Sequence, residues 1–302
     1  MKIAVVGSIN MDMTVKADRI PLKGETIMGQ TLSLISGGKG ANQAFAMARL
    51  GGDVTMYGCV GDDENGRRLI DNMKSVGIHT EKIAVKKGVP TGVALITVAE
   101  NDNAIVVVPG ANAEAGGAYL ESIKEDLLTY DMVVFQHEIP VEDVWKTCLF
   151  LGERKVPVIL NPAPAAAVPL DVIEKVRYIT PNEHEARLIF EESDLETLVK
   201  RYPDKLIITR GSQGVIAADA MGNVVRVPVR AANVLDTTGA GDTLNGAFAL
   251  RRAEGADLEK ALAFANVAAS LSTEKFGAQS GMPDRTETEK ELKSYEEKRH
   301  LK

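Results

Sequence analysis

The glycine-rich segment Asp236-Thr-Thr-Gly-Ala-Gly-Asp242 has the clearest chemical pattern in the chain. A strand-like stretch at 225–234 precedes it, and an apolar run that is compatible with a helix follows it. At a loop-to-helix junction, free backbone N–H groups and the positive end of the helix dipole point at one place, so an anion can bind there. In the first helical turn, Asp242 could accept a proton from a hydroxyl that attacks a bound phosphoryl group. The alternative is that Asp242 only caps the helix.

A second glycine-rich loop, Ser36-Gly-Gly-Lys-Gly-Ala-Asn-Gln43, opens another predicted helix. Its glycines allow a polar ligand to approach the backbone closely, and Asn42 would face outward from the first turn. An ordinary strand-to-helix turn is the alternative interpretation. The spacing differs from the Gly-x-Gly-x-x-Gly of dinucleotide-binding folds, which argues against an oxidoreductase.

Two further pairs of polar residues have spacings that suit ligand binding. Asn10 and Asp12 follow the first apolar run, and residues two apart in an extended chain share one side. An amide beside a carboxylate can bind neighbouring sugar hydroxyls, although both residues are also common in turns. Asn182 and Glu185 are three apart at a predicted helix start, where they could approach Mg²⁺ or form a capping box.

These residues must be positioned by an α/β framework. Short apolar runs that are typical of buried parallel strands occur at 3–6, 54–60, 132–135, 156–160, 177–180 and 206–209. Helical patterns lie between most of them, at 41–50, 64–76, 114–128, 141–152 and 182–190. This alternation predicts a doubly wound, mostly parallel central sheet with helices on both faces. Ligands of such folds bind at the carboxyl ends of the strands.

Two segments lack this alternation and predict a small separate sheet. Residues 13–36 carry several turn signals, and 91–109 suggest strands at 92–99 and 104–108 around a turn at 100–103. Because no helix follows either segment, their apolar face must cover a substrate, a partner subunit or both. We therefore expect a single α/β domain over 1–302 with a discontinuous β lid at about 13–36 and 91–109. The charged tail at 286–302 suggests a solvated helix.

Composition restricts the possible partners and compartment. The net charge of -7 argues against nucleic-acid binding, which needs a basic surface. The two cysteines, Cys59 and Cys148, suggest free thiols in a reducing compartment. No signal-peptide core and no apolar run of bilayer-spanning length occur, so we expect a cytoplasmic protein with no membrane partner.

Taken in order, these motifs resemble the ribokinase/PfkB family of carbohydrate kinases, and the similarity extends over essentially the whole chain. The resemblance implies a ribokinase-like fold that transfers the γ-phosphoryl group of ATP to the 5-hydroxyl of D-ribose, with Asp242 as base. It also implies Mg²⁺, an activating K⁺ and a homodimer formed through the β lid. The alternatives are a kinase of another small sugar or nucleoside, and a non-catalytic regulator that binds a sugar or nucleotide.

The resemblance also implies a role for each matching position. The implied ribose contacts are Asn10, Asp12, Gly38, Lys39, Asn42, Glu138 and Asp242. The implied anion hole is the backbone of Gly239, Ala240 and Gly241. The implied nucleotide contacts are Asn182, Thr209, Gly211, Gly214, Gly241 and Asn266. The implied K⁺ loop comprises Asp236, Thr238, Ser272, Lys275, Gly277 and Gly281, while Glu185 would reach Mg²⁺ through water.

Three positions depart from the family pattern. Asn266 stands where a histidine can lie near adenine, and Leu244 replaces a common phenylalanine in what we interpret as packing. Gly281 replaces a serine, so K⁺ affinity is weaker if that side chain contributes. For Asp242 itself, we expect a pKa near 4 that the helix N-terminus lowers further, so that proton transfer is late.

Overall fold

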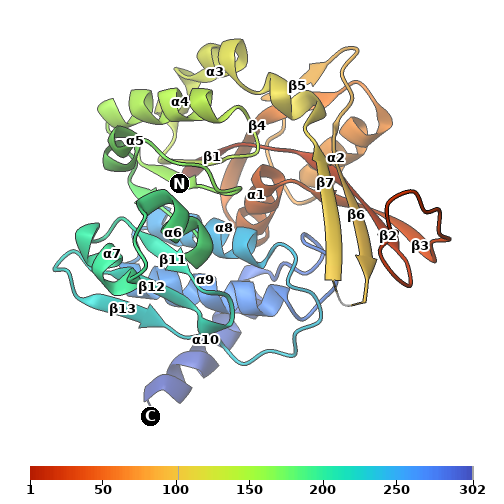
Figure 1. Ribbon diagram of the computed structural model, residues 1–302. Coiled ribbons are helices and arrows are strands. Elements are labelled where there is room, and N and C mark those ends of the chain that lie inside the picture. Colours follow the sequence, from red (N-terminus) through yellow and green to blue (C-terminus); the bar gives the residue numbers. More distant parts are fainter. Residues whose placement is uncertain (101, 301–302) are drawn as a thin grey trace.

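The computed structural model describes residues 1–100 and 102–300, without the side chains of residues 299 and 300. Its centre is a six-stranded sheet in the order β10-β9-β8-β1-β4-β5, in which neighbouring strands run parallel. Helices surround this sheet in Figure 1. The strands are β1 (Lys2–Val6), β4 (Asp53–Gly61), β5 (Ile83–Lys86), β8 (Met132–Gln136), β9 (Val158–Asn161) and β10 (Tyr178–Ile179). The predicted parallel sheet is therefore confirmed.

Helices cover both faces of this sheet, because its strands are apolar on both sides. In β1, Ile3 and Val5 belong to one buried cluster, and Ala4 and Val6 belong to the other. The first cluster packs against α1 (Lys39–Arg49), α2 (Glu64–Ser75), α8 (Ala240–Ala253), α9 (Leu258–Ser272) and α10 (Arg285–His300). The second packs against α3 (Gly117–Ile123), α4 (Val141–Glu153), α5 (Leu170–Lys175), α6 (Glu183–Phe190) and α7 (Leu195–Arg201). Both faces are covered, as the alternating pattern predicts.

A second sheet extends the fold beyond β10. It consists of β11 (Ile207–Thr209), β12 (Val215–Ala218) and β13 (Val224–Val227), which are paired antiparallel. Isolated parallel bridges, Ile179 to Leu206 and Asn182 to Thr209, join β11 to the strand before it. The run at 206–209 was predicted as another parallel strand, and it does lie beside the main sheet, but its ladder partner is antiparallel.

The two segments without helices form a four-stranded sheet, called the small sheet below, in the order β3-β2-β6-β7. It projects to one side of the main body (Figure 1). Its strands are β2 (Asn10–Lys16), β3 (Thr31–Gly37), β6 (Gly92–Ala99) and β7 (Asp102–Val108). Large apolar side chains remain exposed on it, including Leu95, Ile105 and Val106. The predicted turn at 100–103 contains residue 101, which lies outside the described residues.

Two predicted elements differ from the structure. The helix predicted at 114–128 is divided into η1 (Gly110–Glu114), α3 and η2 (Asp126–Thr129). The division falls at Gly116 and Gly117, where the Gly117 N–H donates to Asp143 Oδ2 at 2.8 Å. The strand predicted at 225–234 ends at Val227, because Pro228 has no N–H to continue the ladder.

The C-terminal helix predicted at 286–302 corresponds to α10, whose last two predicted residues lie outside the described part of the chain. None of the helices in the described residues combines the length and apolar character that crossing a membrane requires.

Candidate active site

Asp242 lies in the first turn of α8, where the sequence predicts it. The helix is preceded by Gly239, whose φ of 75° is left-handed, and a Cβ there would come within 2.8 Å of the Ala278 Cβ. A glycine is therefore required on both grounds. The Asp242 side chain is only 8% exposed, although it borders an open cleft.

The backbone around Asp242 can accept an anion. The Ala240 N–H donates to the Thr237 carbonyl at 3.2 Å, so the turn already uses this group. The N–H groups of Gly239 and Gly241 have no acceptor within the described residues. No atom would lie within 4 Å of a Cβ on Gly241, so the space in front of this residue is open. First-turn amides that face open space can bind a negatively charged group.

Two amide side chains from α1 hold the Asp242 carboxylate. Asn42 Nδ2 donates to Oδ2 at 2.9 Å, and Gln43 Nε2 donates to Oδ1 at 3.1 Å. Burial raises the pKa of Asp242 above its ordinary value, although Lys39 and both amides oppose the shift. The expectation of a lowered pKa was wrong, because desolvation of the charged form outweighs the helix N-terminus here. Asp242 is thus a better proton acceptor than its position alone suggests.

Asn10 and Asp12 lie on one side of β2, in the small sheet, rather than at the end of β1. Asn10 is buried, and its Oδ1 accepts a hydrogen bond from Asn112 Nδ2 at 2.7 Å. Asn112 Oδ1 in turn accepts from the Ile9 N–H at 2.9 Å. This arrangement leaves the Asn10 amide nitrogen to donate to a ligand. Asn112 follows no motif, so the sequence analysis missed it.

Charged groups from four parts of the chain face one another in this region. Burial and the carboxylates of Glu138 and Asp242 raise the pKa of Asp12 to about 7, while Lys39 opposes the shift. Burial lowers the pKa of Lys39, but the surrounding carboxylates outweigh it, so the net shift is upward. The structure therefore brings together the predicted residues Asp12, Lys39, Glu138 and Asp242.

Glu138 connects the first strand to the second glycine-rich loop. Its Oε2 accepts hydrogen bonds from Ser8 Oγ at 2.6 Å and from the Lys39 N–H at 3.0 Å. Gly38 precedes α1 as its N-cap, directly beside Lys39. The loop that carries Gly38, Lys39 and Asn42 is thus fixed against the end of β8.

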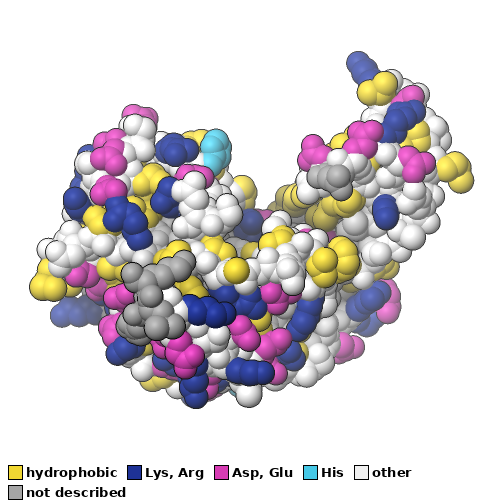
Figure 2. Space-filling view, turned by 90° about the horizontal axis from the view of Figure 1, so that it is seen from below, with side chains coloured by type: hydrophobic (Ala, Val, Ile, Leu, Met, Phe, Trp, Pro, Cys, Tyr) yellow, Lys and Arg dark blue, Asp and Glu magenta, His cyan; other side chains and the backbone are white. Residues whose placement is uncertain are grey.

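A cleft with a cavity volume of ≈ 170 Å³ lies at the carboxyl ends of β9, β10 and β11. Figure 2 shows the molecule hollowed between the main body and the projecting small sheet. The cleft brings together residues from both glycine-rich loops and from the strand ends. They include Lys39, Asn161, Thr180, Asn182, Glu185, Thr209, Gly239, Gly241, Asp242 and Asn245.

Asn182 and Glu185 form the capping box that the sequence left open as an alternative. Asn182 Oδ1 accepts from the Glu185 N–H, and Glu185 Oε2 accepts from the Asn182 N–H, both at 2.8 Å. Both residues nevertheless line the cleft. Burial raises the pKa of Glu185. A carboxylate with a hard oxygen on the cleft wall fits a role near Mg²⁺.

The other predicted nucleotide residues lie apart from this cleft. Gly211 and Gly214 lie at the two ends of the turn that connects β11 to β12 after Thr209. Asn266 is buried in α9, and its Nδ2 donates to the carbonyl oxygens of Val227 and Pro228 at 3.0 and 2.8 Å. Asn266 thus fixes the chain after β13.

The predicted cation loop contains a set of converging oxygen atoms. A Cβ on Gly281 would lie 2.5, 3.0 and 3.4 Å from the carbonyl oxygens of Ser272, Gly277 and Lys275. Asp236 accepts from the N–H groups of Thr238 at 2.9 Å and Gly277 at 2.8 Å. These bonds outweigh burial and lower the pKa of Asp236. Neutral carbonyls with one nearby carboxylate fit a cation of low charge.

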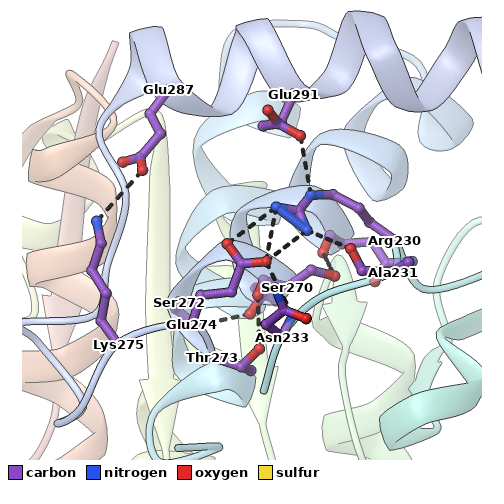
Figure 3. A network of polar contacts seen from close by, with 12 residues as sticks. Arg230, Ala231, Asn233, Ser270, Ser272, Thr273, Glu274, Lys275, Glu287 and Glu291 are labelled. Atoms are coloured by element: carbon purple, nitrogen blue, oxygen red, sulfur yellow. Dashed lines mark hydrogen bonds and ion pairs between the residues drawn. The ribbon is translucent and has the colours of Figure 1, made fainter. Parts of the chain in front are cut away.

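Ion pairs anchor this loop to α10 and to the segment after β13 (Figure 3). Arg230 pairs with Glu274 at 3.0 Å and with Glu291 at 3.4 Å, and its side chain is 14% exposed. Glu274 also accepts from the Asn233 N–H at 3.3 Å. Lys275 pairs with Glu287 at 3.4 Å near the surface.

Several buried amides of the site were not predicted as site residues. Gln43 contacts Asp242, and Gln279 Nε2 donates to Asn42 Oδ1 at 3.0 Å. Asn161 Oδ1 accepts from Gln43 Nε2 at 3.1 Å. Gln43 directly follows the predicted residue Asn42, which was the one available sequence signal. Asn161 is the last residue of β9, and Gln279 lies in the loop after α9. Neither residue belongs to a chemical pattern in the sequence.

Comparisons with known proteins agree with this geometry. The model of the pfkB family of carbohydrate kinases matches residues 1–285. The chain is 47% identical over 290 residues to a ribokinase of Bacillus subtilis (strain 168), covering 96% of this chain and 99% of that protein. It is 42% identical over 298 residues to a ribokinase of Lactococcus lactis, covering 98% of each. The structure of Arabidopsis thaliana ribokinase complexed with ribose and ATP has a TM-score of 0.88 and 31% identity, covering 96% of this chain and 98% of that chain.

Proposed function

The chain belongs to the pfkB family of carbohydrate kinases, and from this premise we propose that it phosphorylates D-ribose at the 5-hydroxyl with ATP, giving ribose 5-phosphate and ADP. One observation carries the proposal. A buried carboxylate, Asp242, stands at a helix N-terminus between open backbone amides and the pair Asn10 and Asp12. The relatives at 47% and 42% identity over nearly the whole chain support ribose as the acceptor.

The sugar would bind between the small sheet and the loop that begins α1. Asp12 can accept hydrogen bonds from two neighbouring hydroxyls, and Asn10 can donate one because Asn112 already occupies its oxygen. Gly38, Lys39, Asn42 and Glu138 would complete this pocket. A pocket built from hydrogen-bonding groups discriminates against sugars that leave those groups unpaired.

Phosphoryl transfer would take place at the first turn of α8. Asp242 accepts the proton of the 5-hydroxyl as its oxygen attacks the γ-phosphorus of ATP, and the bond from that phosphorus to the bridging oxygen of ADP breaks. The backbone of Gly239, Ala240 and Gly241 stabilises the charge on the transferred group. For Ala240 this requires the weak bond to Thr237 to open. Asn182, Thr209, Gly211 and Gly214 would position the nucleotide, and the predicted contact of Asn266 would be indirect, because its amide holds the chain after β13.

Two cations complete the proposal. Mg²⁺ would neutralise the phosphates when bound, and Glu185 would hold it through water. K⁺ would fit the carbonyls of Ser272, Lys275 and Gly277, beside Asp236, Thr238 and Gly281, where it would support the neighbouring anion-binding loop. Replacing potassium with a large organic cation in the assay tests the second role. An unchanged rate would count against the cation loop.

The wider organisation of the molecule is also a proposal. We expect one domain over 1–302, with the small sheet as a lid that closes over ribose. The exposed apolar residues of the small sheet suit a homodimer formed through the lids. We place the protein in the cytoplasm, where ATP and sugar are available to a kinase.

A substrate panel with an ADP-release assay tests the proposed activity. Ribose should give the highest kcat/KM, ahead of a fructose derivative, a ketodeoxy sugar acid and a nucleoside. A higher value for one of these would reassign the substrate within the family. ADP release with none of them would favour a sugar- or nucleotide-binding regulator instead.

A further inference from the structure

Gln43 is fully buried, and its side-chain amide contacts the Asp242 carboxylate. Gln43 itself does not line the cleft. We propose that Gln43 is a positioning residue, whose amide fixes the catalytic carboxylate in its reactive orientation and in its charged form. The inference rests on the proposed function only in taking Asp242 as the base. It adds a residue that does not line the cleft.

The contacts allow the Gln43 amide a single orientation. Its Nε2 lies 3.1 Å from Asp242 Oδ1 and 3.1 Å from Asn161 Oδ1. Asn161 must present this oxygen, because its own Nδ2 donates to the Thr180 carbonyl at 3.0 Å. Reversing the Gln43 amide would place an oxygen against two other oxygens. Its nitrogen is therefore directed at Asp242 by the neighbours as well as by the carboxylate.

Gln136 fixes the other end of the same amide. Gln136 Nε2 donates to Gln43 Oε1 at 2.8 Å, from the last residue of β8. The Gln136 Oε1 is buried without a hydrogen-bond partner in the described residues. An acceptor left in this state destabilises a fold. A glutamine at position 136 is explained if its side-chain nitrogen is needed to orient Gln43.

The charges around Asp242 explain why such a donor matters. Lys39 on α1 favours the ionised carboxylate, whereas Glu138 after β8 and Asp12 on β2 oppose it. Burial opposes ionisation further. Hydrogen bonds from Gln43 and Asn42 counteract these effects, because donors stabilise the charged form. Removing one donor should therefore raise the pKa of Asp242 and free one of its oxygens to rotate.

The test compares Gln43→Met with wild type, since methionine has a similar length and no hydrogen-bonding group. Steady-state kinetics at saturating ribose across pH would give the acid limb of kcat, which reports groups in the complex with bound sugar, and calorimetry would give ribose affinity. We expect the acid limb to move up by about one pH unit. We expect kcat to fall roughly 10-fold through lost orientation, and ribose affinity to change less than about twofold. The matched control is Thr147→Val, which removes the part-buried hydrogen bond of Thr147 to the Asp143 carbonyl on α4 and should leave the acid limb and kcat unchanged.

An acid limb at the wild-type pH in folded Gln43→Met would overturn the proposal. If that variant does not fold, Gln136→Met decides, because it leaves Gln43 in place but releases its amide. An upward shift of the limb in Gln136→Met supports the positioning role, and no shift contradicts it. A wild-type protein that releases no ADP with ribose would instead refute the proposed function, so the two failures are distinguishable.

Discussion

Replacing Asp12 with Asn should stabilise the free protein while abolishing ribose binding. The carboxylate is held among Glu138 and Asp242, and its pKa in the folded protein is about 7. Asn has nearly the same shape but no charge, so Asp12→Asn removes the repulsion and the desolvation penalty together. It also removes the acceptor that would hold two sugar hydroxyls.

The size of the stabilisation follows from the pKa of Asp12. A carboxyl whose pKa is raised on folding costs no stability below its unfolded pKa of 3.8, and costs progressively more as the pH rises toward 7. Integrating this difference gives a penalty of about 4 kcal/mol at pH 8 and about 1.5 kcal/mol at pH 5. Asp12→Asn should raise the free energy of unfolding by up to these amounts, so the gain in stability should be larger at pH 8 than at pH 5.

Urea unfolding of wild type and Asp12→Asn at both pH values measures the effect. Asp63→Asn provides a control of opposite sign. Asp63 caps α2 and accepts from the Gly66 and Thr91 N–H groups, and these bonds help to lower its pKa. Its stabilisation is present in full above the unfolded pKa of 3.8 and is lost only as the pH falls through the folded pKa, so Asp63→Asn should destabilise by the same amount at pH 5 and pH 8. Equal stability of Asp12→Asn and wild type at pH 8, or a larger gain at pH 5, would refute the electrostatic account.

The other two predictions concern residues outside the reacting groups. Asn112→Ala should raise the KM for ribose roughly 10-fold with little change in kcat, because Asn10 loses the partner that orients it; an unchanged KM would remove Asn112 from the site. Arg230→Met should lower the free energy of unfolding by about 2 kcal/mol, since it leaves the half-buried Glu274 unpaired. Lys275→Met, whose ion pair is exposed, should cost less than about 0.5 kcal/mol in the same urea titration, and equal losses would contradict this ranking.

Much of the site could be predicted because its chemistry depends on local patterns. The glycines before Asp242 and the spacing of Asn10 and Asp12 are features of short segments. Asp242 lies in the first helical turn as expected, and Asn10 and Asp12 share one side of a strand, although that strand is β2 and not the end of β1. Most of the central sheet was predictable for the same reason, since its inner strands are largely apolar runs, whereas the short edge strand β5 was not among the predicted runs. The division of the helix at 114–128 was not foreseen, because the bond from Gly117 to Asp143 joins separate elements.

The rest of the site depends on residues that meet only in the folded chain. Gln43 and Gln279 reach the centre from α1 and from the loop after α9, and no spacing in the sequence relates them. The pKa of Asp242 was predicted in the wrong direction for the same reason. Helix position is visible in the sequence, whereas the burial that raises the pKa is a property of the assembled core.

The central claim is that Asp242 serves ribose phosphorylation as the proton acceptor. The most direct measurement compares wild type with Asp242→Asn for ADP release with ribose, together with ribose binding by calorimetry. General-base catalysis contributes roughly 10²–10⁴-fold, so kcat should fall at least 100-fold while ribose still binds. Turnover within a few-fold of wild type in Asp242→Asn would contradict the account.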